Sequence, residues 1–424
     1  MISPRLKYVL AFVGTLVTLH LLLSIHPTYR DHTLPKALRP GSSSSSVTDE
    51  TIVDIPEAAV PSPPTSEELR IAEEANSSRK KANAAFVVLA RNSDLFEFLS
   101  SMRQVEDRFN HWARYDWVFL NDEPFDDQFK RYTSDLASGE TKYGLIPKEI
   151  WEQPDWIDED KAAKGREQMI KMKVIYGHSV PYRNMCRFNS GYFFRHELVL
   201  PYDYYWRVEP GIKLFCDLNY DPFLLMQEQE KVYGFTLSLL EYKETIPTLW
   251  EATKEFMKEN PQYVVDGNAV DFISDDGGED YNLCHFWSNF EIGDMRFWRS
   301  EAYIKYFEHL DKQGGFYYER WGDAPVHSLA AALFLPKEKI HWFDDIGYRH
   351  EPFQHCPQGK SNRDQKCWCD EKDSFDWHGY SCTRRWVAQF PDGTIRKPAD
   401  GQRTAPWKRS DIPEQHPLIN ATAA

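Results

Sequence analysis

Hydrophobic positions follow two patterns along the chain: one long run close to the first residue, and many short runs beyond residue 82. The long run, Tyr8–Ile25, is eighteen residues without Lys, Arg, Asp or Glu. As a helix it would be about 27 Å long, close to the thickness of a bilayer core. Arg5 and Lys7 precede it, so the positive-inside rule makes residues 1–7 a cytosolic tail. The pattern predicts a transmembrane signal anchor over residues 8–25. A cleaved signal peptide is the alternative, but the apolar run is longer than is usual for one.

A polar segment separates this run from the rest of the chain. Residues 31–85 contain no Phe, Tyr or Trp, and they include the serine run Ser42–Ser46. Such a composition buries too little apolar surface to fold. We therefore expect residues 26–81 to form a disordered stem that holds a folded domain away from the membrane. Glycosylation sequons at Asn76 and Asn420 are consistent with a luminal location.

The first short apolar run beyond the stem begins a folded domain. Ala85–Ala90 is continuously apolar, which is typical of a strand buried on both faces. A helical pattern follows over Asp94–Phe109, and Tyr115–Leu120 reads as a second buried strand. Strand, helix and strand at this spacing predict a βαβ unit.

Similar patterns continue through the domain. We expect further helices at Arg166–Tyr176, Pro247–Glu259, Ser300–Gln313 and Ala324–Leu333, and further strands at Tyr204–Val208 and Tyr233–Leu239. Together these elements predict an α/β fold with a mixed central sheet and no internal repeat. The sequence has no GxGxxG or Walker A pattern, which argues against a classical dinucleotide or ATP site.

The aromatic content and the net charge favour some classes of function over others. Aromatic residues make up 15% of the chain, which suits a cleft where sugar faces stack on rings, although a large aromatic core would explain most of them. The formal net charge is −15, opposite in sign to that of most nucleic-acid-binding proteins, so we expect no nucleic-acid partner.

Seven cysteines leave at least one unpaired within the chain if the others form bridges. Cys356, Cys367, Cys369 and Cys382 lie close together near the end of the domain. Four cysteines could instead form a zinc site, but an oxidising secretory compartment favours disulfides. A pairing of Cys186 with Cys284 is a further hypothesis.

One carboxylate follows a predicted strand at a tight turn. The strand Tyr204–Val208 leads into Glu209-Pro210-Gly211. Transfer of a sugar from a nucleotide expels a nucleoside diphosphate, and a divalent cation held by a carboxylate can neutralise the growing phosphate charge. An additional imidazole ligand would favour Mn²⁺ over Mg²⁺. The alternative is that Glu-Pro-Gly is only a turn.

Polar and aromatic groups also concentrate over Tyr281–Ile292, which contains the carboxylate of Glu291. Downstream, Asp323 has the position of a helix N-cap. We interpret His327 as a core residue within the following helix, whereas His350 follows a glycine-containing loop and is freer to act as a ligand.

Two pairs of acidic residues provide further candidates for metal binding. We interpret them as solvated loop residues; they are Asp275-Asp276 and Asp344-Asp345.

Several of these motifs resemble a known family. The sequence is similar to the fungal α-1,2-mannosyltransferases of glycosyltransferase family 15, in order and at matching spacing over about residues 82–400. The motifs that carry the resemblance are Tyr182–Gly191, Glu209–Gly211, Asn282–Glu291 and Arg320–Ser328. The resemblance implies one GT-A-like catalytic domain over residues 82–424, with GDP-mannose as donor and Mn²⁺ as cofactor.

The resemblance also implies roles for individual residues. Glu209 and His350 become metal ligands, and Glu291 becomes the candidate nucleophile. The remaining residues would contact the two sugars or the nucleotide: Tyr176 and Tyr182 at the donor site, and Trp287 and Asp323 near the sugars. Arg91, at the end of the first strand, is our own interpretation for a nucleotide or phosphate contact.

The expected activity is therefore a retaining α-1,2-mannosyl transfer from GDP-mannose to mannose-terminated glycans of glycoproteins or glycolipids. Extension of N-linked or O-linked mannan in the Golgi, by a single-pass type II membrane protein, would fit this activity. Two alternatives remain open: transfer of mannosylphosphate, and an inactive lectin-like protein that only binds mannan.

Overall fold

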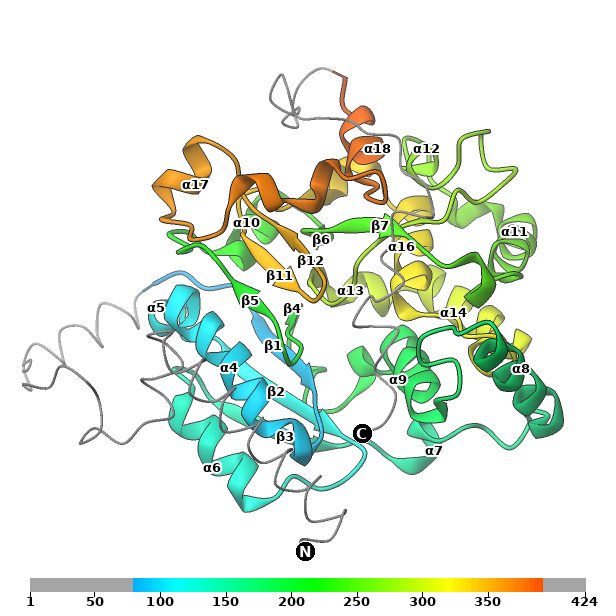
Figure 1. The fold of residues 1–424 in the computed structure, drawn as a ribbon, viewed down its shortest axis with the longest axis horizontal. Helices are drawn as coiled ribbons and strands as arrows, with labels where there is room; N and C mark the ends of the chain where they lie inside the picture. Colours follow the sequence, from blue (N-terminus) through cyan, green and yellow to red (C-terminus); the bar gives the residue numbers. More distant parts are fainter. Residues whose placement is uncertain (1–78, 392–424) are drawn as a thin grey trace, which may run out of the picture. The chain divides into compact units, whose positions relative to one another are not determined.

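The computed structural model of the chain describes residues 79–391 (Figure 1). In this structure, the side chains of the central strands are divided between two hydrophobic cores. Strand β1 (Ala84–Leu89) places Ala85 and Val87 in one core, and Phe86 and Val88 in the other. Because successive side chains of a strand point to opposite faces, a continuous apolar run fits a sheet that is covered on both sides.

The central sheet has seven strands in the order β10-β6-β9-β4-β1-β2-β3. Strand β9 is antiparallel to both of its neighbours, and all other pairs in this sheet are parallel. The sheet is therefore mixed, as the sequence predicted. The strands besides β1 are β2 (Asp116–Asn121), β3 (Thr141–Leu145), β4 (Tyr204–Arg207), β6 (Tyr233–Phe235), β9 (Glu291–Asp294) and β10 (Ile340–Trp342).

Two smaller sheets accompany the central one. A three-stranded sheet contains β5 (Lys213–Leu214), β11 (Tyr348–His350) and β12 (Phe353–His355). A two-stranded sheet contains β7 (Ser238–Leu240) and β8 (Cys284–Phe286). These short strands matter for function because they place His350 and the segment before Glu291.

Helices cover both faces of the central sheet (Figure 1). The core that contains Phe86 takes buried side chains from α4 and α6, and the core that contains Val87 takes them from α9, α11, α14 and α16. The helices are α4 (Leu95–Val105), α5 (His111–Ala113), α6 (Asp127–Leu136), α7 (Lys148–Trp151), α8 (Glu159–Lys171), α9 (Val180–Gly191), α10 (Pro222–Glu228), α11 (Leu249–Glu259), α12 (Val270–Ile273), α13 (Met295–Trp298), α14 (Glu301–Gln313), α15 (Gly315–Tyr318), α16 (Asp323–Phe334), α17 (Lys360–Asp364) and α18 (Thr383–Ala388).

Most elements lie where the sequence predicted them, but two differ. The expected strand Tyr233–Leu239 is two strands, because β6 pairs within the central sheet whereas β7 pairs with β8. The expected helix Arg166–Tyr176 begins earlier and ends earlier, as α8. Its first turn is capped by Asp158, whose side chain accepts a hydrogen bond from the backbone N–H of Lys161.

The expected cytosolic tail (1–7), signal anchor (8–25) and nearly all of the stem (26–81) lie outside the described residues, as do residues 392–424. Within residues 79–391, no helix has the length and apolar character needed to cross a membrane.

Candidate functional site

The candidate site lies where the carboxyl ends of parallel strands meet the first residue of an antiparallel one. Strands β1, β2 and β4 end on this side of the sheet, and β9 begins there with Glu291. A pocket at this edge contains about 320 Å³ of empty space. Its lining combines apolar and polar side chains: Val87, Leu89, Leu120, Phe188, Asn189, Phe193, Tyr205, Arg207 and Glu291. Ligands of open α/β sheets commonly bind at such an edge.

Arg207 is the charged centre of this pocket. It lies directly opposite Glu291 in the antiparallel β4–β9 pair. Its guanidinium forms ion pairs with Glu209 and with Asp323, the latter at 2.5 Å. Burial acts to lower the pKa of Arg207, but the charges of Glu209, Asp323 and Glu291 outweigh it and raise that pKa well above its ordinary value. The sequence analysis missed this residue, although a charged side chain within a buried strand is a usable signal.

Glu209 and His350, the two expected metal ligands, come together although they are far apart in the sequence. His350 Nε2 lies 3.4 Å from Glu209 Oε2. Burial acts to raise the pKa of Glu209, but Arg207 and His350 outweigh it and lower that pKa to about 2. An ionised carboxylate beside an imidazole is a donor set that suits Mn²⁺.

The turn that presents Glu209 needs its glycine. Gly211 has φ +81°, a left-handed conformation that side chains with a Cβ rarely adopt. A Cβ at this position would also lie 3.0 Å from Glu97 Oε1. The chain can therefore turn sharply after β4 and leave the Glu209 carboxylate facing His350.

Glu291 is almost fully buried, at 1% exposure. Its carboxylate accepts hydrogen bonds from the hydroxyls of Tyr205, at 2.6 Å, and Tyr233, at 3.0 Å. His327 Nδ1 lies 3.0 Å from Glu291 Oε2. The interpretation of His327 as a core residue is right about its burial, but it omitted this contact with the candidate catalytic carboxylate.

The expected donor-site tyrosines lie against each other. The rings of Tyr176 and Tyr182 stack with centroids 4.7 Å apart. Tyr176 has φ +53°, a left-handed conformation that is uncommon for a bulky residue, and such conformations concentrate at functional sites. Arg320 lies over the other tyrosine, with its guanidinium carbon 5.2 Å from the Tyr182 centroid.

Arg91 follows β1, but its guanidinium has a local partner. It forms an ion pair with Asp94 at 2.9 Å, which helps to begin the next helical turn. The hydrogen bond that the Arg91 guanidinium donates to the Asp94 carboxylate is the main reason that the pKa of Arg91 is raised, and Tyr176 contributes to the same effect.

The two residues expected near the sugars have different partners: Trp287 contacts His350, and Asp323 contacts Arg207. The ring of Trp287 contacts that of His350, with centroids 5.3 Å apart. Asp323 was expected to cap α16, and this expectation is wrong: Gly322 occupies the N-cap position. The Asp323 carboxylate instead accepts hydrogen bonds from Arg207 and from the Ser288 hydroxyl, the latter at 2.8 Å. Asp323 is the first residue of α16, and its side chain is turned toward Arg207 and Ser288.

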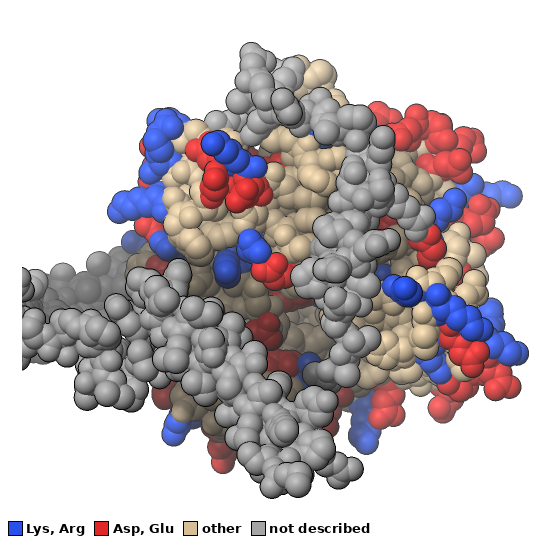
Figure 2. Space-filling view, in the orientation of Figure 1, with Lys and Arg blue, Asp and Glu red and all other residues tan. Residues whose placement is uncertain are grey.

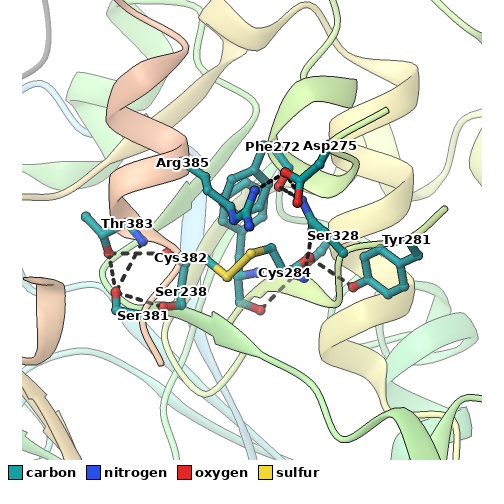
Figure 3. Close-up of a disulfide and its surroundings, with 12 residues drawn as sticks. Ser238, Phe272, Asp275, Tyr281, Cys284, Ser328, Ser381, Cys382, Thr383 and Arg385 are labelled. Carbon is teal, nitrogen blue, oxygen red and sulfur yellow. Dashed lines mark hydrogen bonds and ion pairs between the residues drawn. A yellow bond between two sulfur atoms is a disulfide. The ribbon is translucent and has the colours of Figure 1, made fainter. Parts of the chain in front are cut away.

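Disulfides take up all four late cysteines, as expected, and two of the four pair with cysteines that lie earlier in the sequence. The bridges are Cys216–Cys367, Cys284–Cys382 and Cys356–Cys369. The hypothesis of a Cys186–Cys284 pair is wrong, because Cys284 on β8 is joined to Cys382, at the start of α18 (Figure 3). Cys186 is a free, buried thiol on α9 whose pKa is raised by burial. Since all four late cysteines are bridged, the zinc alternative is also wrong.

The two acidic pairs differ from the expectation of solvated loops in one case. Asp345 is a hydrogen-bond partner of Tyr220, at 2.9 Å, and burial raises its pKa. Asp275 forms an ion pair with Arg385 close to the Cys284–Cys382 bridge (Figure 3). Within residues 79–391, His, Cys, Asp and Glu do not gather in threes in a way that could hold a metal ion.

Charges of both signs are interspersed over the described surface in the view of Figure 2. Acidic and basic side chains alternate with neutral ones there, and a continuous basic face is not visible in this view.

Comparison with protein families places the chain among sugar transferases. Residues 47–390 match the family model described as glycolipid 2-alpha-mannosyltransferase. Glycolipid 2-alpha-mannosyltransferase 1 of Candida albicans is 63% identical over 307 residues, which cover 72% of this chain and 71% of the relative.

Solved structures agree with this match. The mannosyltransferase Ktr4p from Saccharomyces cerevisiae, in complex with GDP, has a TM-score of 0.70 and 40% identity, and the match covers 73% of this chain and 82% of that chain. Core-mannan synthase A from Aspergillus fumigatus, in a Mn/GDP form, has a TM-score of 0.67 and 39% identity, with coverage of 74% and 83%. The α/β fold with a mixed sheet is thus that of a glycosyltransferase.

Proposed function

We propose, since the chain belongs to the glycolipid 2-alpha-mannosyltransferase family, that it transfers mannose from GDP-mannose to a mannose-terminated glycan and forms an α-1,2 linkage. The donor carries an α-linked sugar, so the transfer would proceed with net retention at the sugar carbon. The acceptor would be a mannan chain on a glycoprotein or glycolipid.

The observation that carries this proposal is the arrangement of three carboxylates around one arginine. Arg207 pairs with Glu209 and Asp323 and lies opposite Glu291 in the sheet. In this proposal Glu209 would bind the cation, Asp323 would contact sugar hydroxyls, and Glu291 would be the buried acid at the pocket. A protein that only bound mannan would not need the first and third of these groups.

Glu209 and His350 fit Mn²⁺, the cofactor suggested by the Mn/GDP form of the fungal relative. Both side chains are 26% exposed, so a ligand can reach them. Two protein ligands leave the remaining coordination positions for oxygens of the donor diphosphate and for water. When bound, the ion would neutralise charge on the departing GDP.

The proposal also gives roles to the other site residues. Glu291 would act at the reacting carbon, either as nucleophile or by stabilising positive charge on the sugar. Trp287 and Asp323 would contact the sugars. The stacked pair Tyr176 and Tyr182 would line the donor site, with Arg91 as a more peripheral phosphate contact.

The cellular setting is also part of the proposal. The Tyr8–Ile25 run would anchor the protein as a single-pass type II protein of the Golgi membrane, and residues 26–81 would form the stem. Residues 82–424 would then be one GT-A-like domain in the lumen, where oxidising conditions support the three disulfides.

Incubation of the full chain in detergent with GDP-[¹⁴C]mannose, Mn²⁺ and a panel of α-mannosides tests the proposal. We expect a product that is one mannose heavier, uncharged, and sensitive to an α-1,2-specific mannosidase. A negatively charged product would indicate mannosylphosphate transfer instead. Mannoside binding without any release of GDP would indicate a lectin.

A further inference from the structure

The Glu291 carboxylate is held by side chains from three different elements. The Tyr205 hydroxyl of β4 donates to Oε1, and the Tyr233 hydroxyl of β6 donates to Oε2. His327 Nδ1, from α16, lies 3.0 Å from the same Oε2. His327 and Glu291 have 0% and 1% exposed side chains, so solvent does not compete for these contacts.

Counting hydrogen atoms in this cluster shows that His327 and Glu291 share one additional proton. His327 Nε2 lies 3.1 Å from the backbone carbonyl oxygen of Asn189, which can only accept, so Nε2 carries a hydrogen. A neutral imidazole would then have a bare Nδ1, which cannot bond to a carboxylate oxygen that also only accepts. The 3.0 Å contact therefore requires a proton either on Nδ1 or on Oε2.

The surrounding donors favour the form with the proton on the imidazole. Trp298 Nε1 donates to the Tyr205 hydroxyl at 3.0 Å, so the hydrogen of that hydroxyl is directed to Glu291. Burial, followed by the charge of Glu291, raises the pKa of both Tyr205 and Tyr233 well above their ordinary values, which keeps both phenols as donors. Two phenol donors on one carboxylate stabilise its ionised form.

The charged groups near this pair do not oppose that assignment. Arg207 on β4 faces the pair from one side and is neutralised by its own two ion pairs. Asp323, one turn before His327 on α16, adds a negative charge that favours an imidazolium. The third phenol nearby, Tyr303 of α14, donates to the Ser190 carbonyl instead.

We propose that His327 is a positioning residue: it carries a proton on Nδ1, keeps the buried Glu291 ionised, and selects which carboxylate oxygen meets the sugar. Tyr233 and His327 both contact Oε2, whereas among the described residues Oε1 accepts only from Tyr205. Oε1 therefore retains a free lone pair for the reacting carbon. This inference rests on the proposed function for its consequence in catalysis, but not for the protonation state itself.

A purely structural role for His327 is the competing explanation. Its ring stacks on Trp298 with centroids 4.3 Å apart, and its Nε2 bond to Asn189 ties α16 to α9. Two near-isosteric substitutions separate the possibilities. His327→Asn places an amide N–H close to the Nδ1 position and loses the bond to Asn189, whereas His327→Gln reaches the Nε2 position and loses the donor to Glu291. Both remove the ring and its stacking.

We would measure kcat, the KM for GDP-mannose, the Kd for GDP and the thermal unfolding midpoint for the wild type and both variants, as full chains in detergent. The inference predicts that His327→Gln lowers kcat about 10- to 100-fold with little change in GDP affinity, because a hydrogen bond to a charged group is lost. His327→Asn should retain more of kcat, even though it loses the interhelical bond. The reverse order, with the Gln variant close to wild type, would assign His327 a structural role and overturn the inference.

Nitrogen-15 NMR of the histidine-labelled wild type tests the protonation state without an activity assay and without altering His327. We expect a histidine with both ring nitrogens protonated at pH 7.5 that loses one proton in Glu291→Gln, where the carboxylate charge is absent; a histidine paired elsewhere, such as His355 with Asp376, should not respond. If the substitution leaves every histidine unchanged, the shared proton does not exist. An inactive wild type that still shows this signal would refute the proposed function and leave the pair intact.

Discussion

Replacement of Arg207 by methionine should destabilise the fold more than the loss of an ordinary surface ion pair. Methionine keeps most of the length of the side chain but removes its charge. The Arg207 side chain is only 14% exposed, and its partners Glu209 and Asp323 are 26% and 7% exposed. The variant would leave two neighbouring, largely buried carboxylates without a counter-charge.

The size of the effect follows from that burial. Removal of one partner of a buried ion pair costs about 3–5 kcal/mol, because the remaining charge has lost its compensation. Since Glu209 is partly open to water and retains His350, we expect the lower part of that range. Arg207 also helps to depress the pKa of Asp323, against the opposing effect of burial. A carboxylate whose pKa is lower in the folded state stabilises the fold fully at pH values above its unfolded-state pKa of about 3.9. This stabilisation is lost as the pH falls through the folded-state pKa. The difference between wild type and variant should therefore be full at pH 7 and shrink below about pH 4.

Urea unfolding at pH 7, followed by tryptophan fluorescence in the presence of a chelator, measures this free energy. Arg103→Met is the matched control, because Arg103 pairs with Asp107 at 2.8 Å while their side chains are 62% and 51% exposed. That pair should contribute about 0–1 kcal/mol. Arg207→Lys should recover part of the loss. If Arg207→Met and Arg103→Met destabilise the protein equally, the charged cluster around Arg207 does not have the strength assigned to it.

Three further predictions concern one disulfide, the expected metal ligands and the domain boundary. Replacing both Cys284 and Cys382 by serine removes a disulfide that spans 98 residues. Chemical denaturation should show a free energy of unfolding that is lower by about 2–5 kcal/mol. An unchanged denaturation midpoint would show that the disulfide is not formed in solution. Glu209→Gln and His350→Ala should each weaken both Mn²⁺ binding and GDP binding in calorimetry, because one ion would join the two ligands to the diphosphate; a variant that keeps full activity at low Mn²⁺ excludes its residue as a ligand. A chain that begins at Ala82 should be soluble without detergent and retain activity, and dependence of kcat on the missing residues would move the domain boundary.

Local patterns predicted the strands well because burial on both faces leaves a continuous apolar run. Strand β1 and the following βαβ unit were accessible from the sequence for this reason. The segment Tyr233–Leu239 has the same appearance, yet its two halves belong to different sheets. The choice of partner depends on β9, β10 and β8, which lie far away in the sequence, and no local period encodes it.

The sequence predicted site residues that stand next to a turn or loop motif. It did not predict roles that depend on contacts between distant parts of the chain. Glu209 stands at a turn and His350 ends a short strand after a glycine-containing loop, and the two do come together. His327 has the pattern of a core residue, and only the packing of α16 against β9 shows its contact with Glu291. Cys186 and Cys284 both flank site motifs, but disulfide pairing is decided by the distance between Cα atoms and cannot be deduced from spacing.

The kcat of Glu291→Gln in mannosyl transfer, with the Kd for GDP measured in parallel, tests the central claim most directly. Glutamine has nearly the same shape; its amide oxygen can accept from one of the two phenols, and its NH2 group can donate to the hydroxyl oxygen of the other, so folding and GDP binding should persist. The loss of the anion at the reacting carbon should lower kcat at least about a hundredfold. A variant that transfers mannose at a rate close to that of the wild type would contradict the assignment of Glu291 to the reaction.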